Sequence, residues 1–288
     1  MTKSATRHSP LASRSALLAT CYSPLAGLKS LWRSRDLIRQ MAKREIVGRY
    51  RGSVFGLLWS FFNPVFMLAI YTFVFSVVFK AKWSVGSGSK TEFAIILFAG
   101  LIVFNLFSET VSRSPSLILA NVNYVKKVVF PLEILPVVAI VSSTFHTLVS
   151  IGVLLLFKLI INHQLEFTIL LLPFVLLPLL ILTLGLSWFL SSLGVYLRDV
   201  SQTIGLIMSA LMFVSPIFFP LSALPPSFQT VVLLNPLTFI IEQAREVLVF
   251  GHLPNWAGLV VYLCVSTLVA LLGLIFFQKT RKGFADVL

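Results

Sequence analysis

Charged side chains are scarce in this chain of 288 residues. They make up 11% of the sequence, and only ten residues are Asp or Glu, whereas hydrophobic residues reach 57% and the mean hydropathy is +0.95. A soluble domain carries roughly 25% charged residues and about 45–50% apolar residues. A water-soluble fold could not bury so much apolar surface, so the sequence predicts an all-α integral membrane protein.

Cysteine and catalytic motifs are also sparse. The two cysteines, Cys21 and Cys264, lie in the basic N-terminal segment and in the last apolar run, so no disulfide framework is expected. The sequence has no GxxxxGK[ST] loop for nucleotide phosphates, no HExxH, no His/Cys cluster and no paired carboxylates. His146 has hydroxyl residues nearby but no orienting partner, so we interpret it as a hydrogen-bonding group and not as a catalytic base. We expect no enzyme activity, no metal and no cofactor in this chain.

Six apolar runs are long enough to cross a bilayer, which takes about 20 residues. They lie at about 55–79, at about 93–112, between Glu133 and Lys158, between Glu166 and Arg198, at about 201–219 and at about 256–277. The segment 224–250 is apolar too, but Pro225, Pro226 and Pro236 interrupt it, and each proline removes a backbone donor. We predict a broken, re-entrant helical hairpin there, between the fifth and sixth spans.

The cations indicate the orientation. The formal charge of +13 suggests a nucleic-acid partner at first sight, but Lys and Arg are concentrated in residues 1–56 and in short gaps between apolar runs. That distribution is typical of a positive inner face that contacts anionic lipid. With six spans and both termini in the cytoplasm, the Lys and Arg left outside are Lys80, Lys82, Lys90, Lys158 and Arg245. A seventh span would place the C-terminal cations on the far side.

The segment before the first span is amphipathic. On a helical wheel one face is apolar and the other is basic, the apolar face being Leu31, Leu37, Ile38, Met41 and Ala42 and the basic face being Arg33, Arg39, Lys43 and Arg44. We predict an interface helix over residues 29–52, lying in the inner headgroup layer. The alternative is a solvated segment that carries ordinary orienting charges. Residues 1–28 are predicted to be a mobile cytoplasmic tail, and residues 53–288 the transmembrane domain.

Ionisable groups at membrane depth are costly and are kept for a function. The predicted spans contain few of them, whereas ion-coupled transporters place acidic residues near the midplane. A transporter without a coupling ion and without a nucleotide loop draws its energy from another protein. If this chain is part of a pump, its ATPase is a separate polypeptide.

Short blocks of sequence resemble the membrane subunits of type-2 ABC polysaccharide exporters, the permeases for O-antigen, capsule and teichoic-acid chains. The blocks are Arg39–Gln40, Lys43–Glu45, Arg49–Ser53, Gly56–Trp59, Asn63–Pro64, Asn121–Glu133, Leu197–Val200, Ser215–Phe218 and Leu234–Leu237. Their order and spacing match the family over about residues 36–284. The tail before about residue 28 is longer than the family pattern.

The resemblance implies a fold and partners. Such permeases have six spans, a cytoplasmic amphipathic helix before the first, and re-entrant helices between the fifth and sixth. They act as a homodimer with two copies of an ATPase subunit, which binds ATP and Mg²⁺. The cargo would be an undecaprenyl-diphosphate polysaccharide, most simply of O-antigen type, and no nucleic acid is expected.

The resemblance also places a coupling loop at about 113–133, between the second and third spans, where the ATPase docks. Its candidate contacts are Asn123, Tyr124, Lys126, Lys127, Phe130 and Glu133. Aromatic anchors and cations suit an acidic partner surface, although the two lysines could equally be positive-inside charges. Arg198 and Asp199, in the next inner turn, are either a second contact or a local ion pair.

Aromatic rings bind the C–H faces of sugars as they bind other apolar surfaces. The first span therefore offers a candidate substrate path, made of Phe61, Phe62, Phe66, Tyr71 and Phe75. Glu242, Arg245 and Glu246 share one face of the outer hairpin and form either a surface ion pair or an outer gate. A type-2 efflux permease for a drug, haem or free lipid stays open as an alternative, as does an intramembrane enzyme, which the missing catalytic set disfavours.

Overall fold

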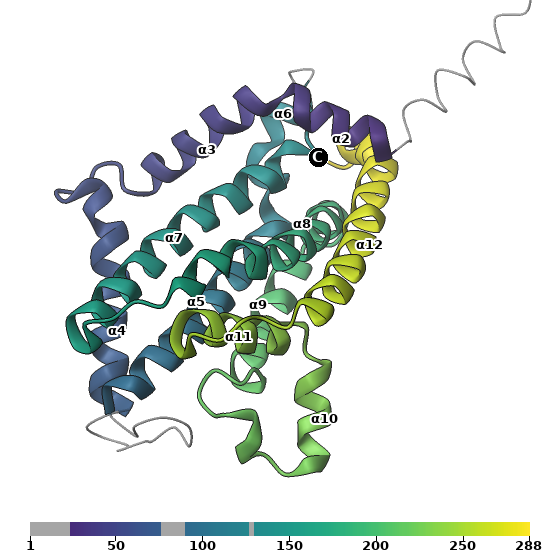
Figure 1. Cartoon of the computed structure of the whole chain (residues 1–288). Helices are drawn as coiled ribbons and strands as arrows, with labels where there is room; N and C mark the ends of the chain where they lie inside the picture. The colour runs from purple at the N-terminus through teal and green to yellow at the C-terminus, as the bar shows by residue number, and fades with distance from the viewer. Residues whose placement is uncertain (1–23, 76–89, 127–129) are drawn as a thin grey trace, which may run out of the picture.

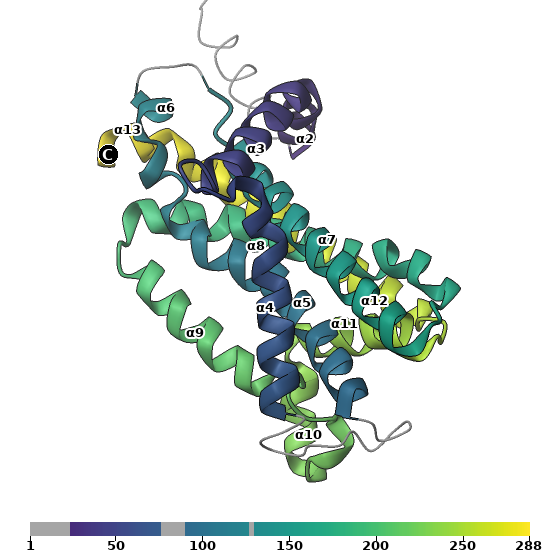
Figure 2. The same ribbon diagram turned by 90° about the vertical axis from the view of Figure 1, so that its left-hand side faces the viewer.

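The computed structural model describes residues 24–75, 90–126 and 130–288, and the secondary structure of these residues is entirely helical. The α-helices are α2 (Pro24–Arg33), α3 (Arg35–Arg49), α4 (Trp59–Phe73), α5 (Lys90–Arg113), α6 (Val122–Lys126), α7 (Ile134–Asn162), α8 (Leu172–Tyr196), α9 (Val200–Val214), α10 (Pro226–Leu234), α11 (Pro236–Arg245), α12 (Trp256–Thr280) and α13 (Phe284–Val287). In two views, α2, α3, α6 and the C-terminus lie at one end of the molecule and α10 lies at the other (Figures 1 and 2).

Five helical segments within the described residues are long and apolar enough to cross a membrane. They are Gly56–Phe73, Glu92–Ser116, Ile134–Ile161, Phe167–Tyr196 and Trp256–Val287. Four of them coincide with the predicted second, third, fourth and sixth spans. The first matches the start of its predicted span, whose last residues, 76–79, lie outside the described residues.

The predicted fifth span, 201–219, is too long. Helix α9 ends at Val214, because Ser215 precedes Pro216 and adopts an extended conformation. Its 15 residues rise about 22 Å at about 1.5 Å per residue, which is less than the roughly 30 Å of a hydrocarbon core. The structure therefore contains a short apolar helix at the fifth position.

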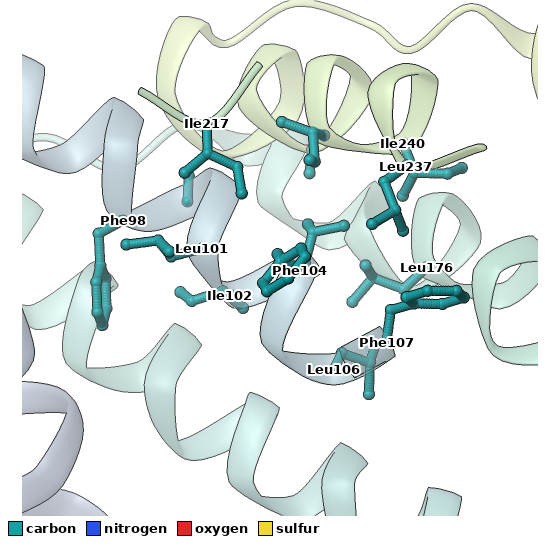
Figure 3. Packing of buried hydrophobic residues seen from close by; sticks show 14 of the residues in the cluster. Phe98, Leu101, Ile102, Phe104, Leu106, Phe107, Leu176, Ile217, Leu237 and Ile240 are labelled. Atoms are coloured by element: carbon teal, nitrogen blue, oxygen red, sulfur yellow. The ribbon is translucent and has the colours of Figure 1, made fainter. Parts of the chain in front are cut away.

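Helix α5 lies at the centre of the core. In the segment that contains α5, 83% of the most apolar 18-residue stretch is buried. In the first segment, Gly56–Phe73, the buried share is 17%. Figure 3 shows Phe98, Leu101, Phe104 and neighbouring side chains of α5 packed against residues of α8 and α11 and against Ile217. The first segment is held by few contacts, whereas α5 is a fixed centre for the other helices.

Helices α8 and α12 cross closely because both have glycine at the contact. A Cβ atom placed on Gly273 would lie 2.1 Å from the carbonyl oxygen of Gly185. Small residues of this kind let two membrane helices approach through their backbones. Trp188 of α8 is buried in a second, smaller core cluster with Leu274 and Phe277 of α12.

The N-terminal amphipathic segment forms two helices instead of one. Helix α2 begins at Pro24, within the predicted tail, because proline is favoured in the first turn of a helix. In α3 the predicted apolar face is covered, with Ala42 buried and Met41 half-buried, and Arg39 and Lys43 are exposed. Residues 1–23 of the predicted mobile tail lie outside the described residues.

The proline-rich stretch forms the two helices α10 and α11, which break at Asn235–Pro236. The side chain of Asn235 accepts a hydrogen bond from the backbone N–H of Leu237 at 2.9 Å and donates one to Ser215 at 2.8 Å. Asn235 therefore caps α11 and ties the break to the end of α9. A π-helical turn, Glu246–Phe250, and Gly251 at φ 74° lead on to α12.

Candidate functional site

The coupling loop, residues 113–133, connects α5 to α7 at the α3 end of the molecule. It contains two short 3₁₀ turns and the five-residue helix α6. The rings of Tyr124 and Phe130 stack with centroids 4.4 Å apart, and both pack against the smaller core cluster. Asn123 and Lys126 are exposed. The two aromatic residues therefore shape the loop from within, and the polar residues form its outer surface.

Glu133 closes the loop and is buried, with 4% of its surface exposed. Its carboxylate accepts from Arg281 at 2.8 Å, and its backbone carbonyl accepts from the indole N–H of Trp188 at 3.0 Å. Glu133 thus ties the loop 113–133 to α8 and to the C-terminal segment, and its buried side chain is not part of the loop's exposed surface. Lys127 lies outside the described residues.

Ion pairs join α3 to the C-terminal end of α5. Arg113 contacts Glu45 at 2.6 Å, and Arg49 contacts Glu109 at 2.6 Å. Arg113 also lies 4.0 Å from Glu109, which makes the four groups one network. A single exposed pair contributes about 0–1 kcal/mol, but a network of four fixes the position of one helix on another. These pairs were not predicted, although Glu45 gave a signal as one of only two acidic residues, with Asp36, in the basic segment 1–56.

Two further contacts extend this network. The Arg44 guanidinium donates to the hydroxyl of Tyr124 at 3.5 Å, which links α3 to α6. The Tyr50 hydroxyl lies 3.3 Å from His146 Nδ1, and the two rings meet edge to face. The interpretation of His146 as a hydrogen-bonding residue between helices is therefore confirmed. Burial raises the pKa of the Tyr50 phenol, so it stays neutral.

The predicted second contact, Arg198–Asp199, lies at the turn before α9, and both residues are exposed. They form no ion pair with each other, so the alternative of a local ion pair is wrong. Asp199 instead accepts, through its backbone carbonyl, from the Thr203 hydroxyl at 3.1 Å.

The five aromatic residues of the candidate substrate path do not share one face of α4. Phe62 and Phe66 lie in an aromatic cluster with Phe55, Trp59 and Phe61, with ring centroids 5.8–6.4 Å apart. Tyr71 and Phe75 pack against the main core, and Phe75 stacks on Phe93 and Phe218. Only the first group presents rings at the surface, with Phe61 41% and Phe66 57% exposed.

The candidate outer gate separates into two pairs. Arg245 is buried, with 1% of its surface exposed, so a surface ion pair is the wrong description. Its guanidinium donates to Glu242 at 2.9 Å and to the carbonyls of Ile96 and Ile217 at 3.1 and 2.9 Å. Arg245 therefore connects α11, the start of α5 and the segment after α9.

Glu246 faces away from Arg245 and contacts His252 at 2.6 Å. Lys158, near the end of α7, donates to the carbonyls of Leu248 and Val249 in the π-helical turn, at 3.0 and 3.2 Å. Two of the cations expected outside the membrane, Lys158 and Arg245, are thus buried donors to backbone carbonyls. The contacts of Lys158 and Arg245 with these backbone carbonyls could not be predicted, because the partners lie far apart in the sequence.

Taken over the described residues, no group of three His, Cys, Asp or Glu side chains could hold a metal ion. The arrangement instead combines apolar spans, a folded loop at one end and an ion-pair network beneath an amphipathic helix. These are the features of a multi-pass α-helical membrane protein.

Residues 36–249 match the family model of ABC-2 type transporters. This is most of the chain, so the protein belongs to the ABC-2 type transporter family.

Similar proteins include an O-antigen export system permease protein RfbA of Klebsiella pneumoniae, 26% identical over 88% of this chain and 95% of that protein. Another RfbA, of Myxococcus xanthus, is 26% identical over 90% of this chain and 98% of that protein. The polysialic acid transport protein KpsM of Escherichia coli is 28% identical over 83% of this chain and 91% of that protein. These relatives are named for the export of O-antigen or the transport of polysialic acid.

Proposed function

We propose that this chain is the membrane subunit of an ATP-driven exporter, which moves an undecaprenyl-diphosphate-linked polysaccharide of O-antigen type from the cytoplasm across the inner membrane. Relatives named for O-antigen and polysialic acid export align over most of their own length, which supports a polysaccharide cargo. The coupling loop is the observation that carries the proposal, because an ordered, partly exposed α6 on a buried base suits a docking partner.

The proposed assembly is a homodimer with two copies of a separate ATPase, which holds ATP and Mg²⁺. Membership of the ABC-2 type family supports the ATPase partner. The dimer is supported by the exposed apolar side chains of α4 and α9, among them Phe66, Phe73, Leu206 and Phe213. Exposed apolar side chains of this kind mark an interface with protein or lipid.

The proposed placement has six spans, with α9 as the fifth, and both termini in the cytoplasm. Helix α3 would lie in the inner headgroup layer, and α10 and α11 would form a re-entrant hairpin at the outer face. The opposite positions of α3 and α10 in Figures 1 and 2 support this placement. So does the basic surface of α2 and α3, because Arg33 of α2 and Arg39, Lys43 and Arg44 of α3 are all exposed.

The contacts suggest how force would travel. Closure of the ATPases on ATP would displace α6, and Arg44, which bonds to Tyr124, would pass that displacement to α3. The pairs Glu45–Arg113 and Arg49–Glu109 would then carry it to α5. ATP binding can shift the exporter from one conformation to another only to the extent that it stabilises the second conformation more than the first.

The coupling loop can be tested by copurifying the chain with its ATPase. We expect Tyr124→Ala with Lys126→Glu to reduce both assembly and the stimulated ATPase rate, because the first change unfolds the stacked loop and the second reverses its surface charge. Lys29→Glu makes the same charge change on an exposed residue of α2 and is the matched control. Unchanged assembly and ATPase rate in the double variant would show that the loop is not the docking site.

The cargo is tested in cells. Deletion of the gene should cause lipid-linked polysaccharide to accumulate on the cytoplasmic side of the inner membrane, and no polysaccharide should reach the cell surface. Normal surface polysaccharide in the deletion strain, together with loss of efflux of a drug, haem or lipid, would assign the chain to the alternative cargo class.

A further inference from the structure

A polar cavity of about 400 Å³ is lined by residues of α3, α4, α5 and α7 and by Tyr50, which follows α3. Ten of the twelve residues that line it are polar or charged. Most of them lie on three helices that are otherwise apolar enough to cross a membrane. Ligand cavities in proteins are commonly about 300–1,000 Å³, so this cavity is large enough for a small ligand.

Several of the lining groups have no partner in the described structure. Asn63 of α4 and Asn105 of α5 are exposed residues whose amides make none of the hydrogen bonds found here. The Nε2 atom of His146 is buried and has no partner either. Unpaired amide and imidazole groups are costly at membrane depth, where no lipid group can satisfy them. Their presence in one cavity indicates a polar occupant.

The charges of the cavity exclude a strong preference for an anion. Arg49 is the lining cation, and its guanidinium already contacts Glu109 at 2.6 Å. A phosphate brought to Arg49 would also meet the carboxylate. The remaining polar lining consists of amides, hydroxyls and the Tyr50 and His146 rings, which both donate and accept hydrogen bonds. An apolar drug or an acyl chain would leave all of them unsatisfied.

We propose that this cavity binds an uncharged sugar unit of the transported polysaccharide. The inference rests on the proposed function for its cargo. Amides of Asn63 and Asn105 suit vicinal hydroxyls, and the ring of Tyr50 or His146 offers an apolar surface for the C–H face of a sugar. The site is distinct from the aromatic cluster of Phe62 and Phe66, which lies on the opposite side of α4 from Ser60 and Pro64.

The experiment measures whether the cavity is occupied in native membranes. Ser108→Cys, which labels the cavity lining and leaves both amides in place, is introduced into a chain carrying Cys21→Ser and Cys264→Ser and is produced with its ATPase. Open membrane fragments without ATP are treated with a charged, water-borne methanethiosulfonate. One set comes from cells that make the lipid-linked polysaccharide, and the other from cells blocked in its synthesis.

We expect Ser108→Cys to react about tenfold more slowly in membranes that contain the polysaccharide, because a site that is occupied nine-tenths of the time exposes its thiol for only about a tenth of the time. Gln164→Cys, an exposed residue in the loop after α7, is the matched control and should react equally in both membranes. Equal reactivity of Ser108→Cys in both would mean that the cavity holds water. Slow reactivity in both would mean that ordinary lipid fills or closes it. Either result overturns the proposal.

A second measurement separates this site from the proposed function. The pair Asn63→Ala and Asn105→Ala should reduce surface polysaccharide several-fold, while copurification with the ATPase verifies that the variant folds. If deletion of the chain blocks export and this variant exports normally, the cavity is not a sugar site and the exporter remains. If deletion leaves export intact, the proposed function itself fails.

Discussion

The crossing of α8 and α12 permits a quantitative prediction for Gly273→Ala. The added Cβ atom would lie 2.1 Å from the carbonyl oxygen of Gly185 and 2.9 Å from its carbonyl carbon. Both neighbours are backbone atoms of a helix, so no side chain can move aside. The two helices must separate by about 1 Å, and overpacking of this kind costs about 1–3 kcal/mol. The core contacts of Trp188 with Leu274 and Phe277 would loosen with them.

Gly152→Ala is the matched control, because nothing lies within 4 Å of a Cβ atom at that position of α7. There the substitution should stabilise the helix by about 0.5–1 kcal/mol. We expect the two variants to differ by about 1.5–4 kcal/mol in free energy of unfolding. Reversible unfolding in mixed micelles of dodecylmaltoside and SDS, followed by tryptophan fluorescence, measures the difference. Equal stability of the two variants would refute the close helix crossing.

Three further substitutions test the buried contacts by the same unfolding assay. Arg281→Met should cost about 1–3 kcal/mol because it leaves the carboxylate of Glu133 buried without its donor, and adding Glu133→Gln should restore part of the loss; no recovery would argue against the pair. Arg245→Met should cost about 1–3 kcal/mol for each backbone carbonyl that loses its donor, and a neutral result would contradict its burial. Tyr50→Phe should cost only about 0.5–1.5 kcal/mol, since it removes one hydroxyl contact with His146 and keeps the ring; a larger loss would mean that the hydroxyl has other partners.

The sequence predicts the apolar helices well. A single run of about 20 apolar residues in a bilayer can satisfy its own backbone hydrogen bonds only as an α-helix. The sequence also predicts the two faces of α3, since the positions of Met41, Ala42 and Lys43 follow from helical periodicity. The end of α9 was predicted five residues too late, because hydropathy does not register the extended residue before Pro216. Helix ends depend on such local backbone restrictions.

The polar contacts were harder to predict because their partners are far apart in the chain. Glu133 and Arg281 are separated by 148 positions, and no periodicity connects them. Arg245 was interpreted from its neighbours on one helix face, whereas two of its partners are carbonyls of other segments. Asn63 and Asn105 gave a signal as amides within apolar runs, but only the fold places both at one cavity.

The central claim is that a separate ATPase drives the export of a lipid-linked polysaccharide through this chain. Inverted membrane vesicles that contain the chain and its ATPase test it directly, with an added glycosidase that cannot enter the lumen. The account predicts that ATP makes the lipid-linked polysaccharide resistant to the enzyme, and that an ATPase without its Walker lysine abolishes this resistance. Resistance that develops with this chain alone, or none when chain, ATPase and ATP are all present, would contradict it.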